Sequence, residues 1–169
     1  MMPNSHFRPI YTTEEAAEAS SLARSNNQIV GLCHGCFDII HAGHVRHFQE
    51  ARNHVDILFL SVSSDEACRK GEGRPAFTQD QRLACAASIA LVDAVVASAA
   101  RTATPMIEAV RPDLYFKGPD YSETGRGHKG LAAELKALHQ VGGVLRITSS
   151  RLVASSTQLL AASVMAQYD

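Results

Sequence analysis

Two histidines three positions apart, His41 and His44, stand on either side of Gly43. They follow an apolar run at residues 29–33 that reads as a buried parallel strand, and a helical pattern begins just after Gly43. The pair therefore falls at the turn between a strand and a helix. A helix N-terminus offers unpaired backbone N–H groups and a partial positive charge, to which the two imidazoles add further donors. This combination predicts a site for a polyphosphate, and therefore a nucleotide site.

The composition is that of an ordinary globular domain. The chain has 169 residues, of which 46% are hydrophobic and 20% charged, enough for one domain with a sizeable core. The formal net charge of −1 gives no general basic field, so we expect no nucleic acid partner. The sequence shows neither a membrane span nor a secretory leader. We therefore expect a cytoplasmic protein, without a membrane partner, whose four cysteines stay reduced.

The N-terminal part predicts a helix that precedes the main domain. Thr12 and Glu15 fit a capping box, and Ala-rich sequence follows, so this helix should run from about Thr13 to Ser25. We expect it to pack outside the core. On this interpretation residues 1–27 are a helical extension and residues 28–169 form the functional domain.

Strands and helices alternate along the rest of the chain. Apolar runs at 29–33, 55–62, 94–96, 114–116 and 144–147 predict strands, helical patterns lie between them, and residues 63–77 read as a cationic loop. This alternation predicts a single α/β domain, with a Rossmann-like, doubly wound parallel sheet of about five strands. Ligands of such sheets bind beyond the carboxyl ends of the strands. The His41 turn, the Lys117 turn and a helix start at Ser155 are all compatible with that edge.

The residues around the histidines match a known pattern. Gly35-Cys36-Phe37-Asp38 followed by His41-Ala42-Gly43-His44 resembles the signature of the HxGH nucleotidyltransferase superfamily, which is cytidylyltransferase-like. Further matches follow in order and resemble the adenylyltransferase domain of heptose 1-phosphate adenylyltransferase (ADP-heptose synthase): Arg69-Lys70-Gly71, Asp80-Gln81-Arg82, Pro112-Asp113-Leu114, Lys117-Gly118-x-Asp120-Tyr121 and Ser155-Ser156-Thr157. The resemblance spans about residues 29–162 and implies that residues 28–169 are a nucleotidyltransferase domain.

The resemblance implies a reaction. A phosphate oxygen of a phosphorylated sugar or polyol attacks the α-phosphate of a nucleoside triphosphate, ATP or CTP, and pyrophosphate leaves. Because the nucleophile is already an anion, no side-chain nucleophile or general base is required, and catalysis reduces to alignment and charge stabilisation. Heptose 1-phosphate is the best-matched acceptor. A Mg²⁺ ion held largely by nucleotide and water, and a homodimer, are implied by the same resemblance.

The resemblance also assigns roles to individual residues. His41 and His44 would stabilise the transition state, and Lys70, on a mobile loop, would reach the phosphates. The residues that would bind the nucleotide are Gly35, Cys36, Phe37, Asp38, Gly43, Lys117, Gly118, Asp120, Ser155, Ser156 and Thr157. The residues that would bind the acceptor are Asp38, Arg69, Arg74 and Arg82.

Several of these residues have simpler interpretations. His41 could be a core histidine, and Asp38 could cap its own turn. Arg82 could pair with Asp80 or with another nearby carboxylate, and the cationic loop could be an ordinary solvated surface. These alternatives stay open at the level of the sequence.

Cys33 and Cys36 form a CxxC pattern, which raises the question of a redox or zinc site. A second metal-binding pair is absent, and a redox CxxC would open a helix rather than close a strand. We therefore assign no metal ligands.

Three features depart from the heptose pattern. Pro119 replaces a glycine, residues 121–130 are a longer segment than we expect, and Arg151 lies near an arginine position of CDP-glycerol-forming relatives. They leave the nucleobase and the acceptor open, and a glycerol-3-phosphate cytidylyltransferase is the alternative enzyme. A nucleotide-binding module without turnover is the alternative from another class, and the presence of His41, His44, Lys70 and Ser155 speaks against it.

Overall fold

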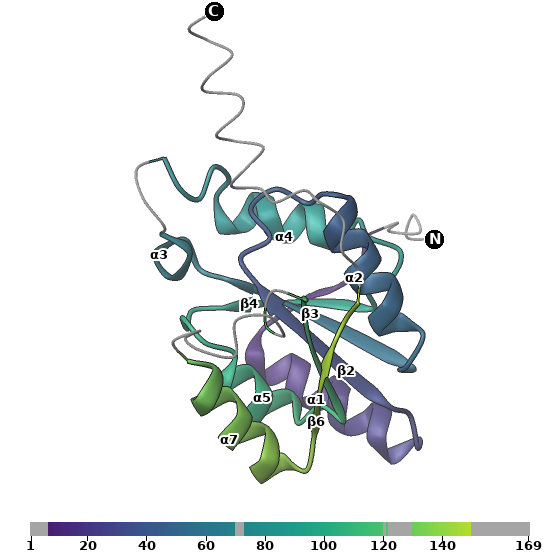
Figure 1. Cartoon of the computed structure of the whole chain (residues 1–169). Coiled ribbons are helices and arrows are strands. Elements are labelled where there is room, and N and C mark those ends of the chain that lie inside the picture. Colours follow the sequence, from purple (N-terminus) through teal and green to yellow (C-terminus); the bar gives the residue numbers. More distant parts are fainter. Residues whose placement is uncertain (1–6, 70–72, 120, 122–129, 150–169) are drawn as a thin grey trace, which may run out of the picture.

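A parallel sheet forms the centre of the molecule (Figure 1). The computed structural model describes residues 7–69, 73–119, 121 and 130–149. Its strands are β1 (Ile10–Tyr11), β2 (Val30–Gly35), β3 (Ile57–Ser63), β4 (Ala94–Ser98), β5 (Leu114–Lys117) and β6 (Val144–Ile147). They lie in the order β1-β4-β3-β2-β5-β6, and all adjacent pairs are parallel. The predicted single α/β domain with a Rossmann-like sheet is confirmed.

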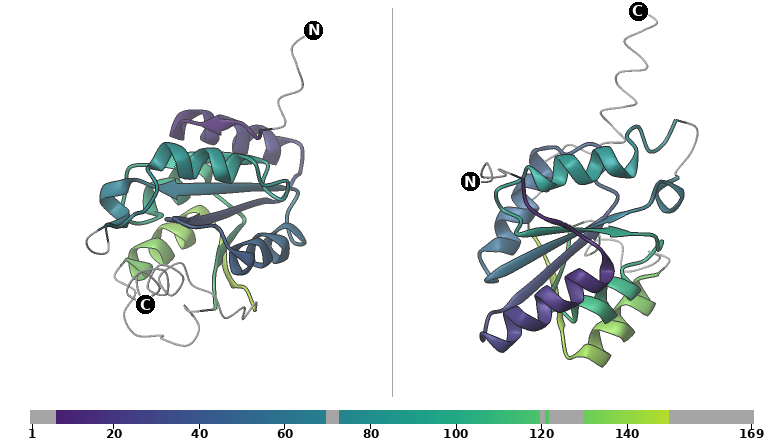
Figure 2. Two further views of the ribbon diagram at one scale, coloured as in Figure 1. Left: turned by 90° about the horizontal axis from the view of Figure 1, so that it is seen from above. Right: turned by 180° about the vertical axis from the view of Figure 1, so that it is seen from behind.

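Helices cover both faces of the sheet (Figures 1 and 2). On one face lie α1 (Thr13–Ser25), α5 (Thr104–Val110) and α7 (Leu131–Val141), and on the other lie α2 (Ala42–Arg52) and α4 (Gln79–Ala87). Since side chains alternate along a strand, Val30 and Leu32 enter the first core and Cys33 enters the second. None of the helices within the described ranges has the length and apolarity needed to span a membrane.

The strand order creates a switch point beside β2. From β2 the chain adds β3 and β4 on one side, and it then returns to add β5 and β6 on the other. The loops that leave β2 and β5 therefore diverge at the carboxyl edge, where open α/β sheets form their ligand-binding crevice. The segment from Gly35 to His41 leaves β2 at this crevice.

Local capping signals place two of the helices where the sequence predicts them. Thr12 and Glu15 form a capping box at the start of α1, and Thr78 and Gln81 form another at the start of α4. The predicted helix from Thr13 to Ser25 is confirmed in full.

The position of α1 and the number of strands differ from the sequence-based expectation. The prediction that α1 packs outside the core is wrong, because Ala16 and Ala23 are buried in it and the Ser20 hydroxyl donates to the Val110 carbonyl at 2.5 Å. The sheet has six strands rather than about five, because β1 pairs with β4. Two residues are too short for any periodic pattern, so only the tertiary structure reveals this strand.

The cationic loop at residues 63–77 also contains a short helix. This helix, α3 (Asp65–Cys68), is capped by the Ser64 hydroxyl, which accepts from the Ala67 N–H at 3.2 Å. It places Cys68 in a buried position just before the basic residues of the loop.

The turn between α7 and β6 allows a test of the packing. A Cβ at Gly143 would lie well inside van der Waals contact with the Pro112 carbonyl oxygen and 2.5 Å from Leu138 Cδ1. We expect Gly143→Ala to lower the free energy of unfolding by about 3 kcal/mol, as measured by urea denaturation. Gly142→Ala is the matched control, since Gly142 has φ +81° but open space at its Cβ, and it should cost only about 1 kcal/mol. Equal losses in the two variants would contradict this account.

Candidate active site

His41 and His44 form the start of α2. His41 is the N-cap residue, and its Nδ1 accepts a hydrogen bond from the Gly43 N–H at 3.1 Å. His44 completes a capping box, with its Nδ1 3.4 Å from the backbone nitrogen of His41. The two rings stack with centroids 4.0 Å apart. Serine, threonine or aspartate usually caps a helix, whereas two imidazole side chains form the cap here.

The cap determines the protonation of His41. Because Nδ1 of His41 accepts a hydrogen bond, the ring proton lies on Nε2, and no acceptor from the described part of the chain engages it. Burial lowers the pKa of His41, so the ring is neutral at pH 7. The first turn of α2 also lacks an acidic residue that would offset the positive end of the helix. The corner therefore offers an anion the Nε2–H donor of a neutral imidazole and the positive end of the α2 dipole.

Aromatic rings hold His44 in place. The Phe37 ring meets it edge-on with centroids 5.3 Å apart, and Phe48 packs against both rings. Burial, followed by the neighbouring His41 and His47, lowers the pKa of His44 to about 4, although a hydrogen bond to the Ile39 backbone opposes this. The side chain is partly exposed and stays beside His41. Neither histidine is thus a core residue.

The loop after β2 depends on two residues with special geometry. Phe37 has φ +50°, which turns the chain after β2. A Cβ at Gly35 would lie 3.0 Å from the Phe37 ring, so this predicted nucleotide-binding residue has a steric reason to be glycine. Cys36 lies between them and lines a cavity described below.

Asp38 anchors the loop that follows α3. Its Oδ1 accepts from the backbone N–H groups of Ala76 and Phe77 at 2.8 and 3.1 Å, and its Oδ2 accepts from Arg74 Nε at 3.0 Å. The carboxylate is 5% exposed. Asp38 therefore caps a distant loop rather than its own turn, and Arg74 is engaged by it. Any contact of either residue with an acceptor has to compete with this ion pair.

Arg82 is also engaged by protein groups. Its guanidinium donates to the carbonyl oxygens of Cys36 and Phe77 at 2.5 and 3.0 Å and to Asp65 Oδ1 at 2.6 Å. The partner carboxylate is thus Asp65 and not Asp80. Arg82 is 1% exposed, so any influence on an acceptor phosphate has to be indirect.

The remaining basic residue of this loop within the described ranges is Arg69, which is exposed at the end of α3. Other predicted site residues lie outside the described residues, namely Lys70, Asp120, Ser155, Ser156 and Thr157.

Lys117 is the last residue of β5, and its charge is compensated inside the protein. Its Nζ lies 2.9 Å from Glu134 Oε2 of α7 and 4.5 Å from the centre of the Tyr121 ring. Glu134 also accepts from the Tyr115 hydroxyl and the Ala103 N–H. Burial acts to raise the pKa of Glu134, but the Lys117 ammonium and these hydrogen bonds outweigh it, so the pKa lies below its usual value. The carboxylate therefore stays charged.

A polar cavity of about 170 Å³ opens at the carboxyl ends of β2, β3 and β5. Its polar lining comes from residues on five segments, namely His34, Ser63, Arg101, Lys117, Tyr121 and Glu134. Gly35 and Cys36 belong to the same wall, which connects the cavity to the His41 corner. Gly118 follows Lys117 directly. A hollow of about 280 Å³ between α1 and β1, β3 and β4 shares no residue with this site.

His34 lines the cavity from the end of β2. Its two ring nitrogens lie 3.0 Å from the Ser61 hydroxyl and 3.2 Å from the Ser63 hydroxyl. Burial, together with the Lys117 charge, lowers its pKa to about 4. His34 was not predicted as a site residue. The sequence nevertheless carries a signal for it, since His34 follows Val30 and Leu32 at every second position of a buried strand face. Arg101 and Glu134 carried no comparable signal.

His47 joins α2 to the other half of the sheet. Its Nδ1 lies 2.8 Å from the Thr148 hydroxyl, which contacts the Lys117 carbonyl oxygen at 3.3 Å. One turn further along α2, Glu50 accepts from the Ser149 N–H. These contacts fix the helix that carries His44 relative to β5 and β6. The sequence analysis also missed His47.

Comparison with known proteins identifies relatives of the chain. The model of the cytidylyltransferase-like family matches residues 32–162. The proteins named bifunctional protein HldE from Alkalilimnicola ehrlichii and Alcanivorax borkumensis are 40% and 42% identical over 75% and 69% of this chain. These matches cover 27% and 26% of the two relatives, so the chain spans about a quarter of their length.

Solved structures share the fold. A lipopolysaccharide core biosynthesis protein from Thermoplasma volcanium aligns with a TM-score of 0.60 and 24% identity, over 74% of this chain and 99% of that one. A pantoate-beta-alanine ligase from Francisella tularensis aligns with a TM-score of 0.58 and 11% identity, over 94% and 77% of the two chains.

The buried histidines make stability depend on pH. Because the folded pKa of His34 is about 4 and the ordinary value is 6.5, the unfolded chain binds more protons between these pH values. Stability is therefore full above about pH 6.5 and falls as the pH drops towards 4, by about 2 kcal/mol for His34 alone at pH 5. Urea denaturation from pH 7.5 to pH 4.5 measures this slope. His34→Asn should flatten it, and His139→Asn, on the exposed side of α7, should leave it unchanged. A slope that His34→Asn does not alter would contradict the assignment.

Proposed function

The chain belongs to the cytidylyltransferase-like family, and on this basis we propose that it is a nucleotidyltransferase acting on a phosphorylated sugar. It would join a nucleotidyl group from a nucleoside triphosphate to the sugar phosphate and release pyrophosphate. The observation that carries this proposal is the stacked pair of His41 and His44 at the N-terminus of α2. Heptose 1-phosphate is the first acceptor to test and ATP the first nucleotide, since the sequence resembles heptose 1-phosphate adenylyltransferase throughout.

The corner at His41 suits the charge changes of this reaction. The acceptor phosphate supplies its own nucleophilic oxygen, so the protein has to align two anionic groups and stabilise the charge that moves to the leaving pyrophosphate. Nε2–H of His41 and the N-terminus of α2 are held in place by the capping box before substrate binds. Preorganised donors of this kind act mainly on the transition state, because they need no rearrangement during the reaction.

We propose that Mg²⁺ accompanies the triphosphate. Among the described residues no group of three histidine, cysteine, aspartate or glutamate side chains is placed to hold a metal ion. The ion would therefore be held by phosphate oxygens and water, with which Mg²⁺ is commonly coordinated. When bound, it would neutralise part of the phosphate charge. Lys70 would contribute further positive charge from its loop.

The polar cavity next to the corner is our candidate for the body of the acceptor. Its fixed charges are largely balanced, because Lys117 is paired with Glu134 at 2.9 Å. Its walls combine the donors and acceptors of His34, Ser63 and Tyr121. Such a lining suits the hydroxyl groups of a sugar or polyol, and Arg101 adds one positive charge for its phosphate.

We propose that the protein is a homodimer, as is common among such enzymes, and this part rests on the family alone. We also propose that no nucleic acid is a substrate, because the formal net charge of −1 gives no general basic field. A glycerol-3-phosphate cytidylyltransferase is the second candidate, and the observation that favours it is Arg151, which lies outside the described residues.

A pyrophosphate-release screen tests the proposal directly. The four nucleoside triphosphates are combined with phosphorylated heptoses, hexoses and polyols, glycerol 3-phosphate included. Release with ATP and heptose 1-phosphate supports the first candidate, and release with CTP and glycerol 3-phosphate supports the second. Absence of release with every pair would contradict the proposed enzyme and favour a binding module.

The role of His41 can be separated from its capping role. His41→Asn keeps a side chain that caps a helix well but removes the Nε2–H donor. We expect kcat to fall by about 10²-fold with the free energy of unfolding nearly unchanged. Steady-state kinetics and urea denaturation measure the two effects, with His139→Asn as the control. Full activity in His41→Asn would refute the catalytic assignment.

Arg101 tests the acceptor cavity. Its removal should weaken binding of the sugar phosphate and leave the triphosphate unaffected, because Arg101 lines the cavity and His41 does not. We expect Arg101→Ala to raise KM for the acceptor by about tenfold with KM for the nucleotide unchanged. Lys136→Ala, on the exposed side of α7, is the matched loss of one positive charge. An increase of KM for the nucleotide instead would place the acceptor elsewhere.

A further inference from the structure

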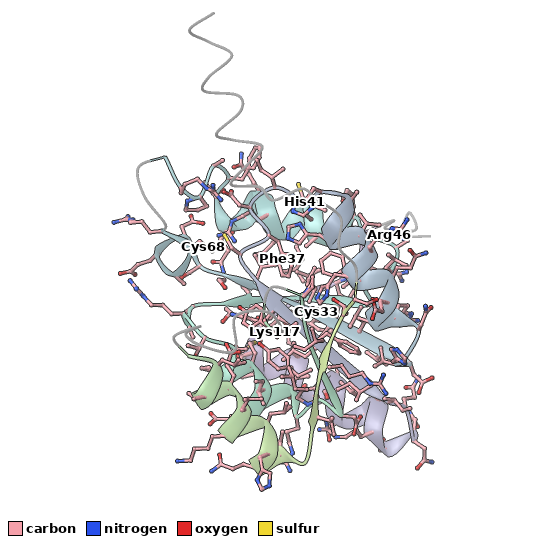
Figure 3. The ribbon with its side chains drawn as sticks, viewed as in Figure 1. Cys33, Phe37, His41, Arg46, Cys68 and Lys117 are labelled. Carbon is pink, nitrogen blue, oxygen red and sulfur yellow. The ribbon has the colours of Figure 1, made fainter. Side chains whose placement is uncertain are left out.

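The thiols of Cys36 and Cys68 lie side by side, although they come from different segments. Cys36 follows β2 directly, and Cys68 is the last residue of α3. Both line the polar cavity, and the two thiol groups are hydrogen-bonded to each other. Figure 3 shows Cys68 on α3 beside the segment that carries Phe37, the neighbour of Cys36.

The two segments are held together by Arg82. Its Nη1 donates to the Cys36 carbonyl at 2.5 Å, and its Nη2 donates to Asp65, the first residue of α3, at 2.6 Å. Cys68 Sγ lies 3.8 Å from the Ser63 carbonyl oxygen, which fixes it from the other side. The contact between the thiols is therefore supported by an ion pair whose guanidinium is buried and whose carboxylate is half-exposed, and it does not depend on the cysteines themselves.

We propose that Cys36 and Cys68 are a site of reversible disulfide formation, with a low-molecular-weight disulfide such as oxidised glutathione as the oxidant. The Cys36 thiolate attacks one glutathione sulfur, and the first glutathione leaves and takes up a proton. Cys68 then loses its proton and attacks the Cys36 sulfur, and the second glutathione leaves as a thiol. The protein loses two protons and two electrons, and one glutathione disulfide becomes two thiols.

The surroundings give the two cysteines different tasks. Cys36 is partly exposed at the cavity wall, where a small disulfide can reach it, whereas Cys68 is 3% exposed. The hydrogen bond with Cys36, and then burial, raise the pKa of Cys68, which makes it a poor first nucleophile. Its role is therefore the second step, in which its target is already beside it. Within the described residues, the other two cysteines are placed differently. Cys33 is fully buried, and Cys85 is exposed on α4.

The disulfide would have a structural effect near the proposed active site. It would connect the segment leading to His41 with the end of α3, one residue before Arg69 and two before Lys70. The proposal goes beyond the nucleotidyltransferase activity and does not depend on it, since the bond is detected chemically and needs no substrate.

The test uses the full chain in glutathione redox buffers. After blocking of free thiols, a non-reducing digest is analysed by mass spectrometry. We expect a peptide pair joined through Cys36 and Cys68, loss of two titratable thiols, and full reversal by dithiothreitol. Cys85→Ser is the matched control and should keep the cross-link.

Cys68→Ser should lose the cross-link and instead retain glutathione on Cys36. Cys68→Val is a second variant for this buried position and should behave in the same way. The proposal is overturned if the wild-type chain carries glutathione on Cys36 without the internal bond, or if cross-links form only between chains through Cys85.

Discussion

One buried guanidinium holds together the loops on which the site depends. Arg82 joins the end of β2, the first residue of α3 and the segment before α4 through the Cys36 carbonyl, Asp65 and the Phe77 carbonyl. A buried charge without partners would be strongly destabilising, so the loops that satisfy it are fixed relative to one another. Asp38 strengthens the same junction by accepting two backbone N–H groups of residues 76 and 77. The corner at His41 starts from this junction.

The polar cavity and the N-terminus of α2 differ in their electrostatic character. The face beneath α1, α5 and α7 is apolar at Val30 and Leu32 and becomes polar at His34, with Lys117 at the same edge of β5. On that side the charges are paired, and the cavity offers hydrogen bonds without a strong field. The N-terminus of α2 has a positive field instead, because its first turn carries no acidic residue that would offset the helix dipole. An anionic tail and a hydroxyl-rich body would therefore bind at adjacent but different places.

Local signals in the sequence predicted the parts of the structure that local interactions determine. The capping boxes of α1 and α4 and the histidine pair fall where their spacing indicates, because each depends on residues within one helical turn. Contacts between distant segments were not predicted, because they depend on residues far apart in the sequence. Strand β1 exists only through its pairing with β4, and the partner of Arg82 became known only when α3 was placed beside it. Lys117 was predicted to bind the nucleotide, and its ion pair with Glu134 of α7 was not predicted, because the two residues are distant in the sequence.

The capping box of α2 has a consequence for the evolution of the fold. One imidazole both caps the helix and lies at the proposed nucleotide site, so position 41 would be under two separate constraints. A descendant that abandoned catalysis would lose only one of them, because the helix would still need an acceptor for the Gly43 N–H. Drift at this position would then be confined to residues such as Asn, Asp, Ser or Thr. Inactive members of the lineage should carry a capping residue there rather than an arbitrary one.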